Sequence, residues 1–407
     1  MFEALTAPAA DPILGLITAF RDDPAPGKID LGVGVYKDQR GMTGVMEVVK
    51  AAERRLVNEQ ESKAYLGPAG NESFNEAIAA LVLGENHAAL RDGRVRSMQA
   101  PGGCGALRLG AELVQRASAA TTVLVSDPTW ANHIPLMAGA GLTVGTYPYY
   151  DVATGQVRFE QMVERLRALD RGSVVLIHGA CHNPTGMDLT LPQWRALAEV
   201  LNQRGLIPFV DIAYQGLGAG IDEDAAGVRL LAEELPEVLI AISCSKNFGL
   251  YRERVGSLIV VGQSRPHAAA AAATIAQVAR GIYSMPPDHG AAVVSMILGD
   301  AALASQWRQE LAVIRDRIFR LRNAFSEALS LACPGQDFSW IVRQRGMFSV
   351  LNLAPQSVTR LRERQHIYMT GDGRVNISGL RESGIDYVAR SVADELRESS
   401  AARTARP

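Results

Sequence analysis

Five short and almost wholly apolar segments recur between residues 122 and 261, and they limit what the chain can fold into. Each is rich in β-branched residues, as strands covered on both faces by helices must be. They are residues 122–126 (TVLVS), 173–178 (SVVLIH), 207–212 (IPFVDI), 238–243 (VLIAIS) and 257–261 (SLIVV). Helical stretches such as 105–117 and 191–204 lie between them. This alternation predicts an α/β fold with a large, doubly wound and mostly parallel sheet.

A different pattern follows the last of these segments. Residues 302–332 have apolar positions at three- and four-residue spacing, which predicts one long helix. Short strands are expected after it, near 338–342, 347–353 and 366–369. The sequence therefore predicts a second, smaller α+β domain.

The composition excludes several classes of protein. A formal charge of −2 over 407 residues argues against a nucleic-acid-binding protein, which would carry a basic excess. The longest apolar run, residues 268–279, is too short to cross a bilayer, so no membrane contact is expected. The first residues lack the basic region of a signal peptide, and the four cysteines have no paired spacing. We expect reduced thiols and a cytoplasmic protein.

Polar side chains follow four of the five apolar segments. In an open α/β sheet, ligands bind at the carboxyl ends of the strands, so these side chains should converge on one crevice. The segments concerned are 126–128 (SDP), 178–184 (HGACHNP), 211–214 (DIAY) and 243–246 (SCSK).

Lys246 is the first candidate for chemistry. Only five of the 41 basic residues are lysines, and Lys246 is the only one after Lys63. A Schiff base requires an amine and cannot use a guanidinium, which stays protonated. The alternative is a solvated loop lysine, but in so arginine-rich a chain an exposed lysine would more often be arginine.

Asp211 and its neighbours complete the pattern of a cofactor site. A carboxylate at the end of a buried strand needs a cation, which a protonated pyridine nitrogen would supply, although a helix N-cap is an equal alternative. Tyr214 could donate to a ring hydroxyl, and Trp130 is either a stacking surface or a core residue. Glycines in 101–108 (PGGCGALR) precede a helix, and form either a phosphate cradle or a plain turn.

Taken together, these residues predict a pyridoxal phosphate site. Lys246 would form the Schiff base, and Arg254 with Ser243 and Ser245 would bind the phosphate. Arg280 and Arg374 could each clamp a carboxylate, but 36 arginines leave neither distinguished by physics alone.

Other catalytic patterns are not supported. His178 and His182 have the spacing of a zinc pair, but they flank a loop and no glutamate follows the first histidine, so we expect no metal. The chain contains no G-x-S-x-G elbow and no G-x-x-x-x-G-K-[ST] motif, which argues against a serine hydrolase and a P-loop enzyme.

The chain resembles the aspartate and aromatic amino-acid aminotransferases, the class I group of fold-type I pyridoxal-phosphate enzymes, over nearly its whole length. The motifs that carry the resemblance are 31–38 (LGVGVYKD), 101–107 (PGGCGAL), 126–133 (SDPTWANH), 181–186 (CHNPTG), 211–216 (DIAYQG), 243–254 (SCSKNFGLYRER), 283–287 (YSMPP) and 373–376 (GRVN).

The resemblance implies a role for each matching residue. Lys246 would bind the cofactor covalently and shuttle the proton, Asp211 would keep the ring nitrogen protonated, and His133 would support Asp211. The other cofactor ligands implied are Tyr214 and Asn183 on the ring hydroxyl, Trp130 on the ring, and Gly103, Cys104, Ser243, Arg254 and, from the partner subunit, Tyr65 on the phosphate. Arg374, beside Gly34, would hold the substrate α-carboxylate, and Arg280 of the partner subunit the distal carboxylate; Trp130 and Asn183 would also line the substrate site.

The resemblance also implies a homodimer with shared active sites. We expect an N-terminal arm over residues 1–10, a small domain over 11–43 and 314–407, and a large cofactor-binding domain over 44–313. The activity implied is ping-pong transamination with 2-oxoglutarate.

Departures from the family pattern bear on the substrate. Cys104 stands where the family usually has a hydroxyl residue, which removes a phosphate ligand. Ala64, Ile282 and Met285 replace polar residues that strict aspartate enzymes place around Arg280, so the pocket favours an aromatic side chain. We therefore expect an enzyme for aromatic amino acids and aspartate. The alternatives are a strict aspartate aminotransferase, a lyase or decarboxylase on the same fold, and a catalytically inactive binding protein.

Overall fold

The computed structural model describes residues 2–6 and 12–404 and divides the chain into two compact units. The larger unit comprises residues 44–183 and 187–316, and the smaller comprises residues 1–43, 184–186 and 317–407. One boundary falls within the long helix α12 (Ala301–Ala332), three residues after the expected boundary. Of the expected N-terminal arm, residues 1 and 7–10 lie outside the described residues, and η1 (Phe2–Ala4) is a short 3-10 helix.

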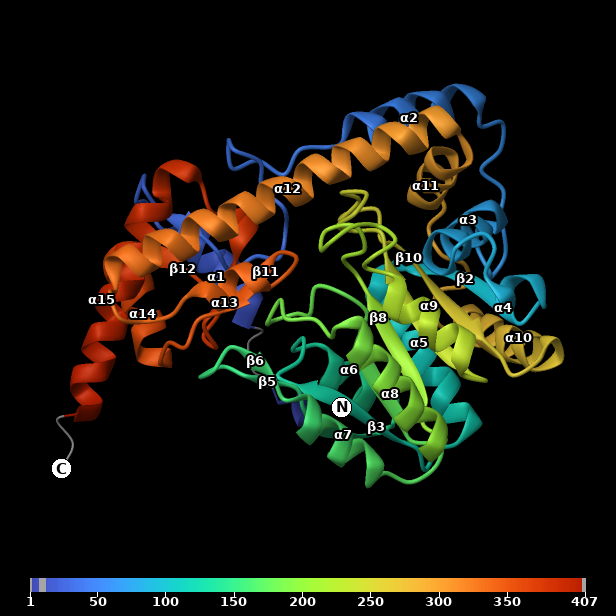
Figure 1. Ribbon diagram of the computed structural model, residues 1–407. Coiled ribbons are helices and arrows are strands. Elements are labelled where there is room, and N and C mark those ends of the chain that lie inside the picture. The colour runs from blue at the N-terminus through green and yellow to red at the C-terminus, as the bar shows by residue number, and fades with distance from the viewer. Residues whose placement is uncertain (1, 7–11, 405–407) are drawn as a thin grey trace. The chain divides into compact units, whose positions relative to one another are not determined.

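A seven-stranded sheet forms the centre of the larger unit (Figure 1). Its strands, in spatial order, are β2 (Val95–Pro101), β10 (Val255–Val261), β9 (Val238–Ser243), β8 (Ile207–Ile212), β7 (Val174–His178), β3 (Thr122–Asp127) and β4 (Thr143–Pro148). The pairs from β9 to β4 are parallel, and β10 is antiparallel to both of its neighbours. All five predicted strands are confirmed, whereas β2 and β4 were not predicted.

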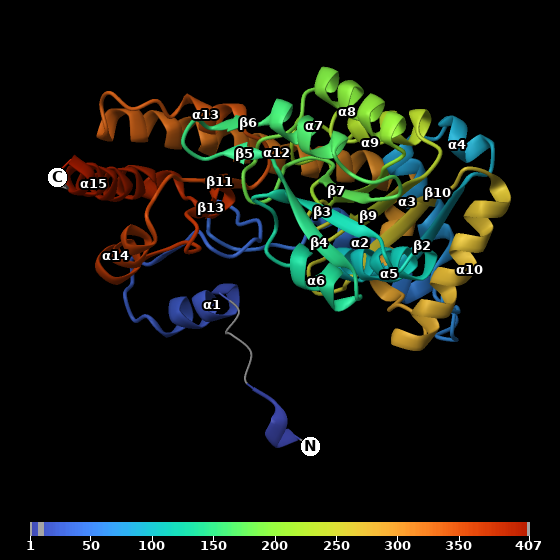
Figure 2. The same cartoon turned by 90° about the horizontal axis from the view of Figure 1, so that it is seen from below.

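Helices cover both faces of this sheet, which explains why its central strands are apolar throughout. Figure 2 shows α7 (Phe159–Arg167), α8 (Leu191–Arg204) and α9 (Ala226–Glu234) on one face, and α5 (Gly102–Ala117), α6 (His133–Gly139) and α10 (Arg265–Ile282) on the other. The start of α8 is fixed by a capping box in which Thr190 and Gln193 satisfy each other's backbone N–H groups, and its end by Gly205 in the left-handed conformation.

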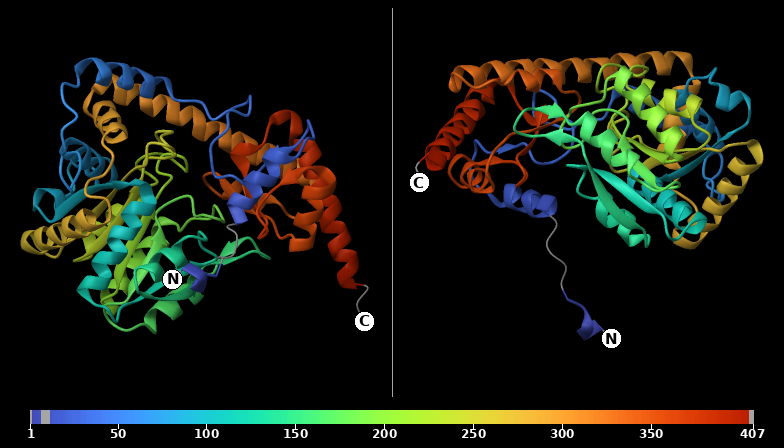
Figure 3. Two further views of the ribbon diagram at one scale, coloured as in Figure 1. Left: turned by 180° about the vertical axis from the view of Figure 1, so that it is seen from behind. Right: turned by 60° about the horizontal axis from the view of Figure 1, so that its bottom comes forward.

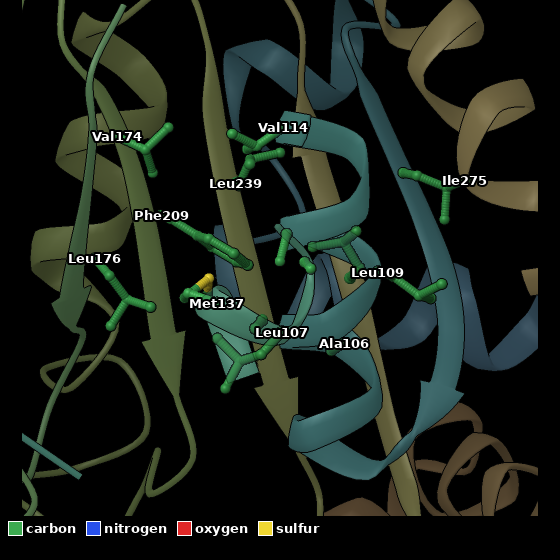
Figure 4. Packing of buried hydrophobic residues seen from close by; sticks show 14 of the residues in the cluster. Ala106, Leu107, Leu109, Val114, Met137, Val174, Leu176, Phe209, Leu239 and Ile275 are labelled. Atoms are coloured by element: carbon green, nitrogen blue, oxygen red, sulfur yellow. The ribbon is translucent and has the colours of Figure 1, made fainter. Parts of the chain in front are cut away.

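The main core lies between the sheet and α5. Phe209 of β8, Leu107 of α5 and Met137 of α6 meet there (Figure 4). The ring of Phe209 is so close to α5 that a Cβ atom at Gly110 would lie 2.3 Å from it. Glycine at this position therefore allows the helix to pack directly on the strand. The remaining elements of this unit are α2 (Glu47–Glu59), α3 (Glu72–Leu83), α4 (Ala88–Arg91), β5 (Tyr150–Asp151), β6 (Gln156–Val157) and α11 (His289–Gly299).

The smaller unit is built from both ends of the chain, whose blue and red segments lie together in Figure 3. β1 (Ile29–Asp30) pairs in parallel with β12 (Ile367–Tyr368), and Phe20 packs edge-on against Tyr368. β11 (Phe348–Val350) pairs antiparallel with β13 (Arg374–Asn376). The helices of this unit are α1 (Pro12–Asp22), the second part of α12, α13 (Ser339–Arg343), α14 (Pro355–Gln365), η2 (Ile377–Gly379), η3 (Glu382–Gly384) and α15 (Ile385–Thr404).

The strand expected near 338–342 is wrong, because these residues form helix α13. Asp337 accepts a hydrogen bond from the backbone N–H of Ser339 at 2.8 Å and so favours a helical turn. The short apolar run had no periodicity that separates a strand from a buried helix. The strands expected near 347–353 and 366–369 are confirmed as β11 and β12.

None of the described helices is both long enough and apolar enough to span a membrane.

Candidate active site

The register of the sheet brings the polar strand ends together. β7 and β8 pair so that His178 lies beside Asp211, and β8 and β9 pair so that Asp211 lies beside Ala241, two residues before Ser243. Lys246 follows in the next turn. The convergence expected from the strand-end pattern is therefore present in the larger unit.

Asp211 is a buried carboxylate held by a histidine. Its Oδ2 lies 3.0 Å from His133 Nε2, and His133 Nδ1 lies 2.8 Å from the hydroxyl of Thr129. Because a carboxylate only accepts, Nε2 donates to Asp211, and Nδ1 forms the hydrogen bond with the Thr129 hydroxyl. Burial by itself raises the pKa of Asp211, but the hydrogen bond from His133 and nearby charges, Lys246 among them, outweigh it and lower the net pKa. Asp211 is therefore ionised at neutral pH.

Two further histidines, His178 and His182, pack behind this pair with tilted rings. The His178 ring lies 5.0 Å from that of His133 and 4.1 Å from that of His182, measured between centroids. Burial lowers the pKa of His178 to about 3, with the charge of His133 as a second cause, so the ring is neutral. Potential ligand atoms of His133, His178 and Asp211 lie within 4.8 Å of one another, but the Nε2 atom of His133 is already bonded to Asp211. Asp211 and His133 therefore form a hydrogen-bonded pair, with the neutral ring of His178 packed behind it.

The Lys246 side chain lies close to the ring of Tyr214. Its Nζ is 5.0 Å from the centroid of the Tyr214 ring, and its charge is one of those that lower the pKa of Asp211. Tyr214 and Asn183 are both about 5% exposed. The amine, the carboxylate and the phenol are thus close enough to surround one planar ligand.

Backbone and side chains form a cradle at the start of α5. A Cβ atom at Gly102 would lie 2.3 Å from the Arg254 guanidinium, and one at Gly103 would lie 3.1 Å from the Cβ of Ser243. The guanidinium also donates to the Ser245 hydroxyl at 3.3 Å. Free amides at a helix N-terminus, an arginine and two hydroxyls are the ligands that a phosphate requires. These residues fit a phosphorylated cofactor.

Cys104 belongs to the same cradle. Its sulfur accepts a hydrogen bond from Asn132 at 3.5 Å. Burial raises the pKa of the Cys104 thiol, and the nearby Arg254 charge only partly offsets this. The thiol is therefore protonated at neutral pH and offers only a weak hydrogen-bond donor.

Of the two roles that the sequence left open for Trp130, the structure shows packing against the core. Trp130 also meets His133 edge-on, with ring centroids 5.2 Å apart and an interplanar angle of 86°. The sequence did not single out Thr129 or Asn132, although both lie in the motif that contains Trp130 and His133.

Gly34 and Arg374 lie in the smaller unit, where Phe348 joins them. The Arg374 guanidinium is 4.6 Å from the centroid of the Phe348 ring and donates to the carbonyl of Gly32 at 2.8 Å. A Cβ atom at Gly34 would lie 3.1 Å from the same ring. Sequence reasoning missed Phe348, because only the pairing of β11 with β13 brings it to Arg374.

Tyr65 and Arg280 are exposed in the single chain. Tyr65 is 91% exposed, and Arg280, in the last turn of α10, donates to the Ser284 hydroxyl. Ile282 and Met285 lie next to Arg280 in the chain, and Ile282 is also exposed.

The mostly parallel sheet, with Lys246, the buried Asp211 and the cradle at the start of α5 near its strand ends, indicates the class of protein. Residues 26–392 match the family of class I and II aminotransferases, and the chain belongs to this family, with the fold of type I pyridoxal-phosphate enzymes. It is 45% identical to the aromatic-amino-acid aminotransferase of Pseudomonas aeruginosa, covering 94% of this chain and 96% of that protein. It is 44% identical to the aspartate aminotransferase of Escherichia coli, covering 97% and 100% of the two chains.

A solved structure agrees with this assignment. The aromatic-amino-acid aminotransferase of Burkholderia pseudomallei, covalently bound to pyridoxal phosphate, superimposes with a TM-score of 0.95 at 41% identity. The match covers 97% of this chain and 99% of that one.

Proposed function

We propose that the protein transfers an amino group between an aromatic amino acid or aspartate and 2-oxoglutarate, with pyridoxal phosphate as the cofactor and by a ping-pong mechanism. The observation that carries the proposal is the joint presence of Lys246, an ionised Asp211 and the Gly102–Gly103 cradle at adjoining strand ends. The relatives with these names support both classes of amino donor.

The residues of the larger unit would hold the cofactor. Pyridoxal phosphate, when bound, supplies an aldehyde for amine exchange and a ring that withdraws electrons from the substrate α-carbon. Ser243, Arg254 and the amides of Gly103 and Cys104 would bind the phosphate, and Tyr214 and Asn183 the ring hydroxyl. Trp130 would cover the ring face, and Lys246 would bind the aldehyde.

Two groups of this chain would handle protons. The ionised Asp211 carboxylate would keep a proton on the ring nitrogen, and the His133–Thr129 pair holds that carboxylate in place. The Lys246 amine would take a proton from the substrate α-carbon and deliver it across the amino nitrogen, at the carbon that the cofactor aldehyde contributes.

Arginines would bind the substrate carboxylates. Arg374, supported by Phe348 and Gly34, would bind the α-carboxylate that every amino donor carries. Arg280 of the partner subunit would bind the distal carboxylate of aspartate, glutamate or 2-oxoglutarate. 2-Oxoglutarate carries two carboxylates and would occupy both arginines, whereas a lyase or decarboxylase that acts on a monocarboxylic amino acid needs only one carboxylate site.

The same proposal includes a cytoplasmic homodimer. The 91% exposure of the Tyr65 side chain supports a role for Tyr65 of the partner subunit as a phosphate ligand. The four cysteines are free, which is typical of a reducing compartment.

A panel of amino donors with 2-oxoglutarate tests the reaction type. We expect glutamate to form with tyrosine, phenylalanine and aspartate, and each donor to yield its 2-oxo acid in equal amount. Release of carbon dioxide or free ammonia in place of glutamate would identify a decarboxylase or a lyase and overturn the proposal.

The same panel orders the substrates. Because Ala64, Ile282 and Met285 make the surroundings of Arg280 apolar, we expect kcat/KM for tyrosine or phenylalanine to equal or exceed that for aspartate. A buried polar group that an aromatic substrate ring leaves without a hydrogen bond costs about 1–3 kcal/mol of binding free energy. Ala64, Ile282 and Met285 carry no such amide or hydroxyl groups. A preference for aspartate of about 100-fold, equivalent to nearly 3 kcal/mol, would instead indicate a strict aspartate aminotransferase.

Replacement of Cys104 by threonine should strengthen cofactor binding. A hydroxyl is a better donor to phosphate than the protonated thiol, and one such bond contributes about 1 kcal/mol, or roughly fivefold in the dissociation constant. The constant is measured by titrating the apoenzyme with pyridoxal phosphate. Cys104→Ala is the control that removes the thiol without adding a hydroxyl, and a Cys104→Thr enzyme that binds no more tightly than Cys104→Ala would contradict the expectation.

A further inference from the structure

Arg322 is a buried arginine at the centre of the smaller unit. It lies in α12, its side chain is 1% exposed, and it is among the largest fully buried side chains of the protein. Its guanidinium donates to one segment, residues 341–349, from several directions. The acceptors are the carbonyl oxygens of Ile341, Arg345, Gly346 and Phe348, the amide oxygen of Gln344 and the hydroxyl of Ser349.

These hydrogen bonds fix the strand that supports Arg374. Arg322 Nη1 lies 2.7 Å from the Ser349 hydroxyl, and Nη2 bonds the carbonyl oxygen of Phe348. β11 pairs with β13 so that Val350 lies beside Arg374. The Phe348 ring in turn packs under the Arg374 guanidinium at 4.6 Å. A displacement of Arg322 would therefore move the surface on which Arg374 rests.

The same guanidinium meets the turn that follows Asn183. Gly186 has a positive φ of 68°, and a Cβ atom there would lie 2.4 Å from the Phe348 carbonyl oxygen and 3.1 Å from Arg322 Nη2. The carbonyl oxygen of Gly186 also accepts a hydrogen bond from the backbone N–H of Arg345 at 2.6 Å. Arg322 thus contacts both β11 and the turn of residues 184–186.

We propose that Arg322 is a positioning residue that holds Arg374 in the orientation needed to bind the substrate α-carboxylate. The inference rests on the proposed role of Arg374. A planar guanidinium with five donors can serve acceptors that fan out around it, whereas the three donors of a lysine ammonium radiate from one atom. Lysine at position 322 keeps the charge and loses this spread of hydrogen bonds.

Carboxylate binding by the holoenzyme tests the proposal without turnover. The probes are 3-phenylpropionate and maleate, which cannot be transaminated, and their dissociation constants are measured from the change in cofactor absorbance. Loss of one hydrogen bond to a charged group weakens binding by about 10- to 100-fold, so Arg322→Lys should weaken both probes by about that factor. The KM values for phenylalanine and 2-oxoglutarate should rise by a similar factor, with kcat nearly unchanged, because uniform binding is lost.

Controls separate this role from a general loss of stability. Arg320→Lys changes an exposed arginine of the same helix and should leave every constant unchanged. Ser349→Ala removes one acceptor of Arg322 and should weaken the probes by about threefold. If Arg322→Lys does not fold, Ser349→Ala decides the question.

Three results would overturn the proposal. The first is a folded Arg322→Lys enzyme with unchanged probe binding, and the second is a loss confined to kcat. The third, where Arg322→Lys does not fold, is unchanged probe binding by Ser349→Ala. A wild-type enzyme that neither binds the probes nor transaminates would instead contradict the proposed function.

Discussion

Replacement of Lys246 by alanine should lower kcat at least about 1,000-fold. A positioned general base alone contributes about 10²- to 10⁴-fold, and Lys246 is also the proposed Schiff-base amine. The cradle of Gly103, Ser243 and Arg254 remains in this variant, so pyridoxal phosphate should still bind, though without a covalent link. The measurements are steady-state turnover with each amino donor and cofactor retention after gel filtration.

Two further variants show which property of Lys246 matters. Lys246→Arg keeps the positive charge but cannot form a Schiff base, so it should lose as much activity as the alanine variant. Lys50→Ala removes an exposed lysine that pairs with Glu47 at 2.7 Å and should be fully active. Turnover of Lys246→Ala within about tenfold of wild type, well below the contribution of a general base, would remove Lys246 from the mechanism.

Replacement of Arg280 by leucine should separate the two classes of amino donor. Removing one partner of a desolvated charge pair costs about 2–5 kcal/mol, so kcat/KM for aspartate should fall by about 30-fold or more. Phenylalanine places no carboxylate there, and leucine suits the apolar surroundings of Ile282 and Met285. Its kcat/KM should change by less than about fivefold, which is within the effect of a modest packing change.

The control for this variant lies on the same helix. Arg265→Leu changes an exposed arginine at the start of α10 and should affect neither donor. Arg280→Lys keeps the charge without the bidentate geometry and should give an intermediate loss with aspartate. Equal losses of kcat/KM for aspartate and phenylalanine would rule out a role for Arg280 confined to the distal carboxylate.

The sheet of the larger unit was predictable where its strands are buried on both faces. Strands β7 and β9 are buried at every position, and strands buried on both faces have uninterrupted apolar sequences. β4 (Thr143–Pro148) lies at the edge and is mostly half-exposed, so its sequence resembles that of a loop. Segment 338–342 was wrongly predicted because five apolar-rich residues fit either periodicity.

Site residues were predictable where a local sequence pattern marks them, and not where only strand pairing brings them together. Asp211 lies at the end of one apolar strand and Lys246 in the turn after another, and a local sequence pattern marks both positions. Phe348 and Arg374 are brought together by the register of two strands 26 residues apart, which no local pattern encodes. The hydrogen bond from His133 to Asp211 was expected only from the resemblance to a family.

Two of the five lysines have structural reasons that the sequence did not reveal. Lys28 Nζ donates to the carbonyl oxygens of Phe20 and Asp23, each at 2.6 Å, at the end of α1. A cation is favoured at this end of a helix. Lys37 Nζ lies 2.7 Å from the buried carboxylate of Asp30. A compact ammonium suits both positions. The few lysines of this chain therefore serve more than one structural role.

The pairing of β1 with β12 has a consequence for synthesis on the ribosome. Residues 44–316 form a nearly contiguous unit, so the site of Lys246 and Asp211 can assemble once residue 316 has emerged. Residues 29–30 are made early, but their partners at 367–368 are made almost last. Gly34 is also made early, whereas Phe348, which lies against it, and Arg374, which lies against Phe348, are made late. We therefore expect the proposed cofactor-binding residues of this chain to come together before the proposed substrate-binding residue Arg374 is in place.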